Sequence, residues 1–290
     1  MKTGKKLCLL LILFIIIGAG LYIVSQRYDL PQKPPSSQPS ADEAPQNSEP
    51  DSNNQPENTG AQDIPSNENL TDAEKSIAAF AAQNGLSMAD YPASLVDLLN
   101  RNPETEDFVL SYPLEHNQTH QIDLSDCVNT GSVPLLMQWD KRWGYITYGD
   151  DVAALTACGP VCLSMAALYV TGDASLSPDR IIEFSKENGY CVYGNGSSWT
   201  LISEGGTKLG LDVTELPLVE SRIIDNLKVG NPIICIMGPG DFTAGGHFIV
   251  MTGYEDGKIK INDPNSYERS AKLWNYDDIC DQILNLWAIR

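Results

Sequence analysis

An apolar stretch over residues 7–24 is the first clear pattern along the chain, and no charged side chain interrupts it. A helix of that length nearly matches the hydrocarbon core of a bilayer. Three lysines precede the stretch and only Arg27 follows closely, a bias that places the N-terminus in the cytoplasm. The pattern predicts a cytoplasmic segment over 1–6, a transmembrane signal anchor over 7–24 and an extracellular remainder. A cleaved signal peptide, cut near Gly18-Ala19-Gly20, is the alternative.

Prolines and polar residues replace the apolar pattern over residues 25–66. Because such a segment has too little apolar surface to offset the entropy of ordering, we expect a disordered linker there. Helical spacing starts after Thr71-Asp72-Ala73-Glu74, which has the form of a capping box. Two further short helices, each stopped near a proline, are predicted over 94–100 and 104–111. Residues 67–131 are therefore expected to be a helical leader region that packs against the following domain.

Residues 132–290 show helical spacing first and strand-like alternation later. Helices are predicted over 158–170, 177–189, 219–228 and 276–281. Strands are predicted over 233–237, 247–254, 258–262 and 284–289. Ser177 and Pro178 stand in the preferred cap and first positions of the second helix. Helices followed by antiparallel strands predict an α+β domain rather than an alternating α/β one.

The chain of 290 residues carries 38 acidic and 19 basic residues, a net charge of −19 at neutral pH. This balance argues against nucleic acid and anionic lipid as partners of the folded part. The seven cysteines follow no regular spacing. The sequence therefore predicts no metal site and no cofactor, and it leaves the pairing of cysteines into disulfides open.

One cysteine and one histidine are placed to act together. Cys158 opens the long apolar helix at 158–170, and His247 begins a strand, whereas His116 and His120 lie in a polar connecting segment. A helix N-terminus and a neighbouring imidazolium both favour the thiolate form of cysteine. We therefore predict Cys158 as the nucleophile and His247 as its general base and acid.

A histidine in this role needs a partner that fixes its tautomer, and Asp263 is the candidate. The hairpin loop within 254–258 decides whether the two side chains meet. A two-residue turn puts Asp263 on the opposite face of the hairpin from His247. A three-residue loop that pairs Tyr254 with Lys258 instead puts the two on one face, diagonal to each other. We therefore predict the three-residue loop.

Two further features concern the substrate. The backbone N–H of Cys158 and the side-chain amide of Gln138 are the candidate donors to an oxyanion. Trp199 either lines a substrate cleft or packs in the core. Several glycines suit the close approach of an extended peptide chain: Gly238, Gly240, Gly245 and Gly246.

These residues resemble a known family. The resemblance depends on Gln138, the stretch 143–149, Cys158-Gly159-Pro160, Gly246-His247-Phe248 and Asn262-Asp263-Pro264. The chain is similar to the papain-like cysteine peptidases of clan CA, family thirty-nine, whose best-known members clip leader peptides after a double glycine during bacteriocin export. It looks most like the stand-alone, membrane-anchored branch. The likeness spans about 133–286.

The resemblance implies a papain-like α+β fold, with N-terminal helices packed on a C-terminal antiparallel sheet. It implies Cys158 as nucleophile, His247 as base and acid, Asp263 as orienting residue and Gln138 as oxyanion donor. We therefore expect a membrane-tethered extracellular peptidase that cleaves peptide or protein substrates through an acyl-enzyme. A papain-like scaffold retained as a catalytically silent surface binding module is the alternative.

Overall fold

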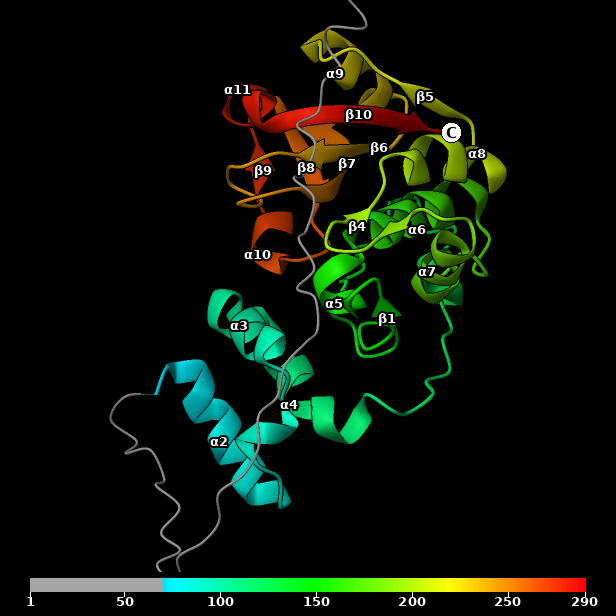
Figure 1. The fold of residues 1–290 in the computed structure, drawn as a ribbon. Coiled ribbons are helices and arrows are strands. Elements are labelled where there is room, and N and C mark those ends of the chain that lie inside the picture. Colours follow the sequence, from blue (N-terminus) through cyan, green and yellow to red (C-terminus); the bar gives the residue numbers. More distant parts are fainter. Residues whose placement is uncertain (1–69) are drawn as a thin grey trace, which may run out of the picture. The chain divides into compact units, whose positions relative to one another are not determined.

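The computed structural model describes residues 70–290 (Figure 1). The predictions for the cytoplasmic segment 1–6, the anchor 7–24 and the linker 25–66 lie outside the described residues. Within 70–290, no helix is both long enough and apolar enough to cross a membrane.

A six-stranded antiparallel sheet forms the C-terminal part of the chain, with strand order β5-β10-β6-β7-β8-β9 (Figure 1). Its strands are β5 (Val213–Glu215), β6 (Ile233–Met237), β7 (His247–Glu255), β8 (Lys258–Asn262), β9 (Leu273–Trp274) and β10 (Ile283–Ile289). Two short hairpins lie outside it, formed by β1 (Thr147–Tyr148) with β2 (Asp151–Val152) and by β3 (Cys191–Val192) with β4 (Gly196–Ser197). All of β6 is buried, because both faces of the sheet are covered.

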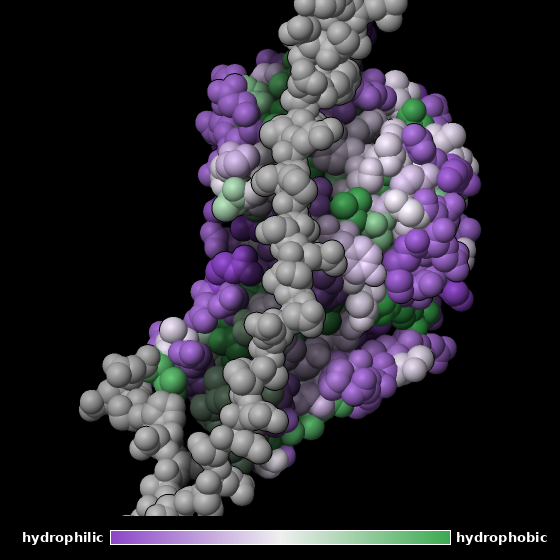
Figure 2. Space-filling view, viewed as in Figure 1, coloured by the Kyte–Doolittle hydropathy of each residue, from purple (hydrophilic) through white to green (hydrophobic). Residues whose placement is uncertain are grey.

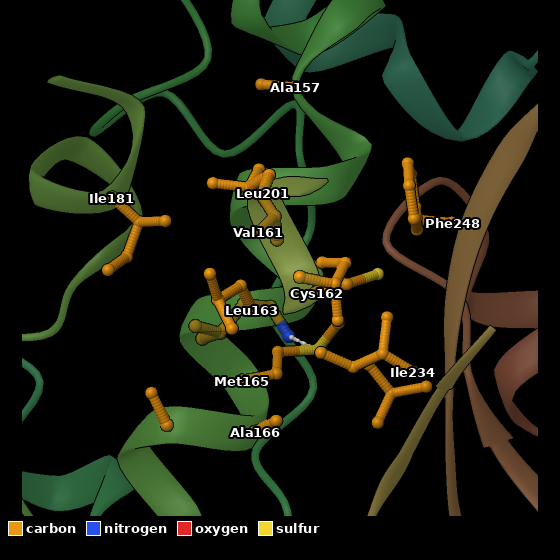
Figure 3. Packing of buried hydrophobic residues seen from close by; sticks show 14 of the residues in the cluster. Ala157, Val161, Cys162, Leu163, Met165, Ala166, Ile181, Leu201, Ile234 and Phe248 are labelled. Atoms are coloured by element: carbon orange, nitrogen blue, oxygen red, sulfur yellow. Dashed lines mark hydrogen bonds between the residues drawn. The ribbon is translucent and has the colours of Figure 1, made fainter. Parts of the chain in front are cut away.

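Helix α6 (Cys158–Thr171) covers one face of the sheet. Residues 159–168 of this helix are all buried, as expected for a helix that is hydrophobic all round. Figure 3 shows Ile234 and Phe248 of the sheet on one side of α6 and Ile181 of α7 (Pro178–Glu187) on the other. Around it lie α5 (Ala153–Thr156), the π-helical turn η5 (Leu201–Gly205) and α8 (Gly206–Lys208).

The opposite face of the sheet is covered by α9 (Glu220–Lys228), through Ile223 and Leu227, and by Ile279 of α11 (Tyr276–Ile279). A short helix α10 (Tyr267–Ser270) follows β8, and η6 (Cys280–Gln282) precedes β10. Helices thus come first and the antiparallel sheet last, which confirms the predicted α+β class. On the face shown in Figure 2, hydrophilic residues predominate and hydrophobic areas are small.

The leader region contains three helices, α2 (Asp72–Asn84), α3 (Ala93–Arg101) and α4 (Glu106–Glu115). Single 3-10 turns accompany them, η2 (Met88–Asp90), η3 (Pro103–Thr105) and η4 (Ser125–Cys127). The predicted capping box is confirmed, since Thr71 Oγ1 accepts from the Glu74 N–H at 3.2 Å and the Thr71 N–H donates to the Glu74 carboxylate at 2.7 Å. The proline expected to stop the third helix instead lies inside α4. Pro113 has no N–H to donate to the Val109 carbonyl, and the helix ends two residues later, at Glu115.

The leader helices share their hydrophobic cluster with Tyr145 and Ala154 of the following domain. The Tyr145 hydroxyl donates to the Phe108 carbonyl at 2.8 Å. A Cβ added at Gly144 would lie only 2.6 Å from the Phe108 ring, so glycine permits this close contact. The leader region is therefore packed directly on the segment that precedes α6.

The β7–β8 hairpin differs from the predicted one. It has a two-residue turn at Asp256-Gly257, with positive φ at both residues, and it pairs Glu255 with Lys258. The predicted three-residue loop is therefore wrong. A bulge at Thr252 then shifts the register by one residue, so that Asn262 pairs with Val250. The bulge puts Asp263 on the same strand face as His247 after all.

Candidate active site

Cys158 is the first residue of α6, and its thiol is half-buried. The His247 side chain and the backbone N–H groups of Gly159 and Phe248 are the neighbours that lower the pKa of this thiol. Burial raises the pKa of a thiol, but the adjacent His247 side chain outweighs it, so the pKa of Cys158 is lowered. A Cβ at Gly159 would lie 2.8 Å from Ser197 Oγ, so this position must be glycine for β4 to approach the start of the helix.

His247 is buried at the start of β7, and its Nε2 lies 2.8 Å from Asp263 Oδ1. Its other ring nitrogen, Nδ1, is therefore the one left to face the Cys158 thiol. Burial lowers the pKa of a histidine, but the Asp263 carboxylate and the Cys158 thiol outweigh it and raise the pKa of His247 to about 10. The lowered pKa of Cys158 and the raised pKa of His247 together favour a thiolate–imidazolium pair.

Asp263 is completely buried, and both of its carboxylate oxygens are hydrogen-bonded. Oδ1 accepts from His247 and from the Asn265 N–H, each at 2.8 Å, while Oδ2 accepts from Arg269 Nε at 2.5 Å. Burial raises the pKa of a carboxyl, but His247 and Arg269 outweigh it and lower the pKa of Asp263. The predicted trio of Cys158, His247 and Asp263 is thus brought together, with His247 hydrogen-bonded to Asp263 and close enough to Cys158 to lower the pKa of its thiol.

Arg269 lies in α10 and was not predicted as part of the site. Its ion pair with Asp263 neutralises the second carboxylate oxygen, which compensates part of the cost of burying the charge. The only sequence signal was a cation six residues after Asp263, and such a spacing has no regular meaning outside a long helix. Arg269 contacts Asp263 and makes no hydrogen bond or ion pair with His247, so any effect it has on His247 passes through Asp263.

The leader region holds the turn that carries Asp263 and Arg269. The Glu104 carboxylate accepts from the N–H groups of Tyr267 and Glu268, at 2.7 Å and 3.0 Å, at the start of α10. It also accepts from the Ser266 hydroxyl at 3.2 Å. The Asn102 amide donates to the Asn265 carbonyl at 2.8 Å. These bonds join η3 and its N-cap residue to the loop between β8 and α10.

Gln138 is buried next to this loop, because its backbone N–H donates to the Pro264 carbonyl at 2.7 Å. Its side-chain Nε2 donates to the Ala154 carbonyl at 2.6 Å. Its Oε1 has no hydrogen-bond partner within residues 70–290. One amide hydrogen of Gln138 is thus committed to Ala154, and the oxyanion role of this residue stays a prediction.

Two hollows meet at Cys158, and both are lined by Cys158, Asn195 and Gly246. The larger, of about 440 Å³, includes Ser94, Asp97 and Arg101 of the leader helix α3 together with Asp150 and Asp151, so it contains charged side chains. The smaller, of about 280 Å³, is lined by Ser197, Trp199, Ile236, Gly245, Phe248 and Leu284. Trp199 therefore lines the cleft. Gly238 and Gly240 line neither hollow, whereas Gly245 lines the smaller one and Gly246 lines both.

The remaining cysteines of the described chain form no disulfide, and all six cysteines within 70–290 are free. Cys162, one turn after Cys158, is fully buried, and burial raises the pKa of its thiol well above the usual value. No group of three or more His, Cys, Asp or Glu side chains in this part of the chain is arranged to hold a metal ion.

The Peptidase_C39 like family model matches residues 130–290 of the chain. Among solved structures, the chain is similar to the peptidase domain of Streptococcus ComA, described as a bifunctional ABC transporter involved in a quorum sensing pathway. The identity is 19%, the match covers 55% of this chain and 96% of that chain, and the TM-score is 0.37. A putative C39-like peptidase from Bacillus anthracis is 15% identical, with 59% of this chain and 98% of that chain covered and a TM-score of 0.34. No curated protein matches the chain.

Proposed function

The chain belongs to the Peptidase_C39 like family, and on that premise we propose that it is a cysteine peptidase whose Cys158 thiolate attacks the carbonyl carbon of a peptide bond. The observation that carries this proposal is the arrangement at the meeting point of the two hollows, where His247 lowers the pKa of the Cys158 thiol and is itself hydrogen-bonded to Asp263. A depressed thiol pKa beside a buried imidazole is the condition that thiolate attack requires.

The geometry assigns a role to each atom of the proposed reaction. The Cys158 sulfur forms a bond to the carbonyl carbon while His247 Nδ1 gives its proton to the leaving amine, and the carbon–nitrogen bond breaks. Water then attacks the acyl-enzyme, and Nδ1 takes a proton from that water as the carbon–sulfur bond breaks. Asp263 holds the ring through Nε2 in both steps. The Cys158 N–H and Gln138 are the proposed oxyanion donors.

The proposed setting is the outer face of a membrane. The uninterrupted apolar stretch at 7–24, with lysines before it, supports a tethered peptidase whose folded part is extracellular. The net charge of −19 supports a peptide or protein substrate over nucleic acid.

Alkylation of the full chain with iodoacetamide tests the function at mildly acidic pH. Cys158 is expected to react first, because its pKa is lowered while burial raises the pKa values of Cys162, Cys191 and Cys235. Hydrolysis of a mixed peptide library is expected to fall in proportion to the Cys158 that has been alkylated, measured by mass spectrometry. Labelling of Cys158 no faster than that of the other cysteines, together with no hydrolysed peptide, would favour the silent binding module.

A second prediction concerns the leader region. Glu104→Ala removes the acceptor for the N–H groups that open α10, and we expect about 1 kcal/mol lower stability, the usual cost of a lost cap. Because α10 carries Arg269, the position of Asp263 is expected to loosen, with a roughly tenfold loss of kcat/KM, a size typical of small misplacements. The loss of kcat/KM is measured by peptide hydrolysis, and the effect on the site by the rate of Cys158 alkylation at mildly acidic pH.

Glu106→Ala is the matched control, because Glu106 is exposed and makes no hydrogen bond to α10. Both rates are expected to stay native in this variant. Glu104→Gln retains one acceptor oxygen and is expected to restore part of the loss. A Glu104→Ala variant that is less stable but hydrolyses and alkylates at native rates would assign Glu104 a purely structural role.

A further inference from the structure

We infer that the smaller hollow beside Cys158 is a subsite for one bulky apolar side chain of the substrate. The inference rests on the proposed function and names its substrate class, which is peptides with an aliphatic or aromatic residue close to the cleaved bond. The double-glycine specificity suggested by the resemblance would leave this hollow empty.

Large apolar side chains of the hollow are exposed although they adjoin Cys158. Trp199 is 43% exposed and Leu284 is 55% exposed, while Ile236 and Phe248 form a buried floor at 4% and 2%. The Trp199 ring is held edge-on against Trp287, with centroids 6.4 Å apart. A hollow next to a nucleophile that combines large apolar side chains with a few polar groups is the usual form of a binding site, and a bound apolar side chain would cover Trp199 and Leu284.

The glycines before His247 keep this hollow open. Neither Gly245 nor Gly246 has a positive φ, so neither is required by the backbone. A Cβ added at Gly245 would have no atom within 4 Å, and one at Gly246 would meet only Ile236 Cδ1, at 3.9 Å. Packing within the protein therefore does not require glycine at these positions. A side chain at Gly246 would occupy space beside Cys158, so what glycine provides there is room for a ligand.

The lining of the hollow selects against charge. No Asp, Glu, Lys or Arg side chain is among the residues that line it, whereas the larger hollow has three aspartates and one arginine. Ser197 Oγ is already hydrogen-bonded to the Tyr148 hydroxyl at 2.7 Å. A charged substrate side chain would lose its water there without gaining an oppositely charged partner. An uncharged apolar side chain would instead gain contact with the exposed Trp199 and Leu284.

Peptides varied at each of three positions on either side of the cleaved bond test the subsite. At one position, we expect kcat/KM for Leu, Met or Phe to exceed that for Gly, Asp or Lys by at least about tenfold, the scale on which apolar pockets discriminate. Trp199→Ala is expected to reduce this preference, and Gly246→Val to remove it by filling the hollow. Tyr193→Ala, which replaces an aromatic residue 78% exposed and outside the lining, is the matched control and is expected to keep the preference.

Binding separates the subsite from the chemistry. Peptides added to the Cys158→Ala protein are expected to change its tryptophan fluorescence when they contain Leu or Phe, but not when Gly replaces that residue, and Trp199→Phe is expected to abolish the change. Equal rates and equal binding for Leu and Gly peptides would overturn the subsite while leaving the peptidase intact. A fluorescence response to Leu peptides in a chain that hydrolyses none of them would support the subsite and overturn the proposed function.

Discussion

Cys158→Ala is expected to abolish hydrolysis of every peptide that the native chain cleaves, with a fall in kcat of roughly 10⁶-fold, the size seen when a peptidase nucleophile is removed. The variant has no atom that can form the acyl-enzyme, so only binding and oxyanion stabilisation remain. The change removes one half-buried sulfur atom from the first residue of α6, so the fold is expected to remain. Initial rates with a cleaved peptide and the thermal unfolding midpoint measure the two effects.

Cys162→Ala is the matched control within the same helix. Cys162 is fully buried among the side chains between α6 and the sheet (Figure 3), and burial holds its thiol in the neutral form. The variant is expected to lose some stability through a small cavity and to keep its hydrolysis. Hydrolysis by Cys158→Ala at a native rate would contradict the proposed nucleophile, as would an equal loss in Cys162→Ala.

The parts of the fold that local pattern determines could be predicted. The capping box at Thr71, the Ser177-Pro178 helix start and the buried β6 follow from side-chain spacing and cap chemistry within a few residues. Cys158 at a helix start is also a local feature. The small number of histidines in the chain predicts the meeting of Cys158 with His247, and in the structure His247 lies close enough to lower the pKa of the Cys158 thiol.

The hairpin shows where local reasoning reached its limit. The prediction that Asp263 faces His247 is correct, but it places the extra residue that makes this possible in the hairpin loop, whereas the structure has it within β7. Asp256-Gly257 adopts positive φ at both positions and closes a two-residue turn, which is the conformation that an Asp-Gly pair favours. The extra residue is Thr252 inside β7. A bulge has no sequence signal there, because threonine is an ordinary strand residue.

The contacts around Asp263 could not be predicted because they join distant segments. Glu104 and Ser266 are 162 residues apart, and Asn102 and Asn265 are 163 apart. No periodicity connects such pairs. Arg269 falls in a four-residue helix that the apolar pattern did not indicate. The sequence therefore predicts the leader helices only as a packing region, although Asn102 and Glu104 of this region bind the loop that follows Asp263.

Asp263→Ala is expected to lower both activity and stability. Without the carboxylate, His247 loses the acceptor that fixes its ring and stabilises its charged form, and a loss of about 10⁴-fold in kcat is expected from the comparable change in serine peptidases. The change also leaves the Arg269 guanidinium, 25% exposed, without its partner. Breaking a buried ion pair costs about 3–5 kcal/mol, so a clear drop in the free energy of unfolding is expected.

The pH dependence of stability and of hydrolysis in the native chain also reports on Asp263 and His247. The pKa of Asp263 is lowered by folding, so its stabilising contribution is present above the usual carboxyl pKa and is lost as the pH falls through the lowered value. The pKa of His247 is raised to about 10, so its contribution is complete below the usual imidazole pKa and is lost as the pH rises towards 10. Hydrolysis is therefore expected to rise with the ionisation of Cys158 and to fall as His247 deprotonates. In Asp263→Ala the falling limb is expected to move to lower pH.

Asp263→Asn separates the charge of this residue from its shape. If the asparagine oxygen faces His247 Nε2, its NH₂ group must face Arg269 Nε–H, which puts donor against donor. Arg269→Gln in the same chain supplies an acceptor at that place. The double variant Asp263→Asn/Arg269→Gln is therefore expected to be more active and more stable than Asp263→Asn alone, as measured by kcat and chemical unfolding. If the double variant gains nothing over the single one, Arg269 does not position Asp263.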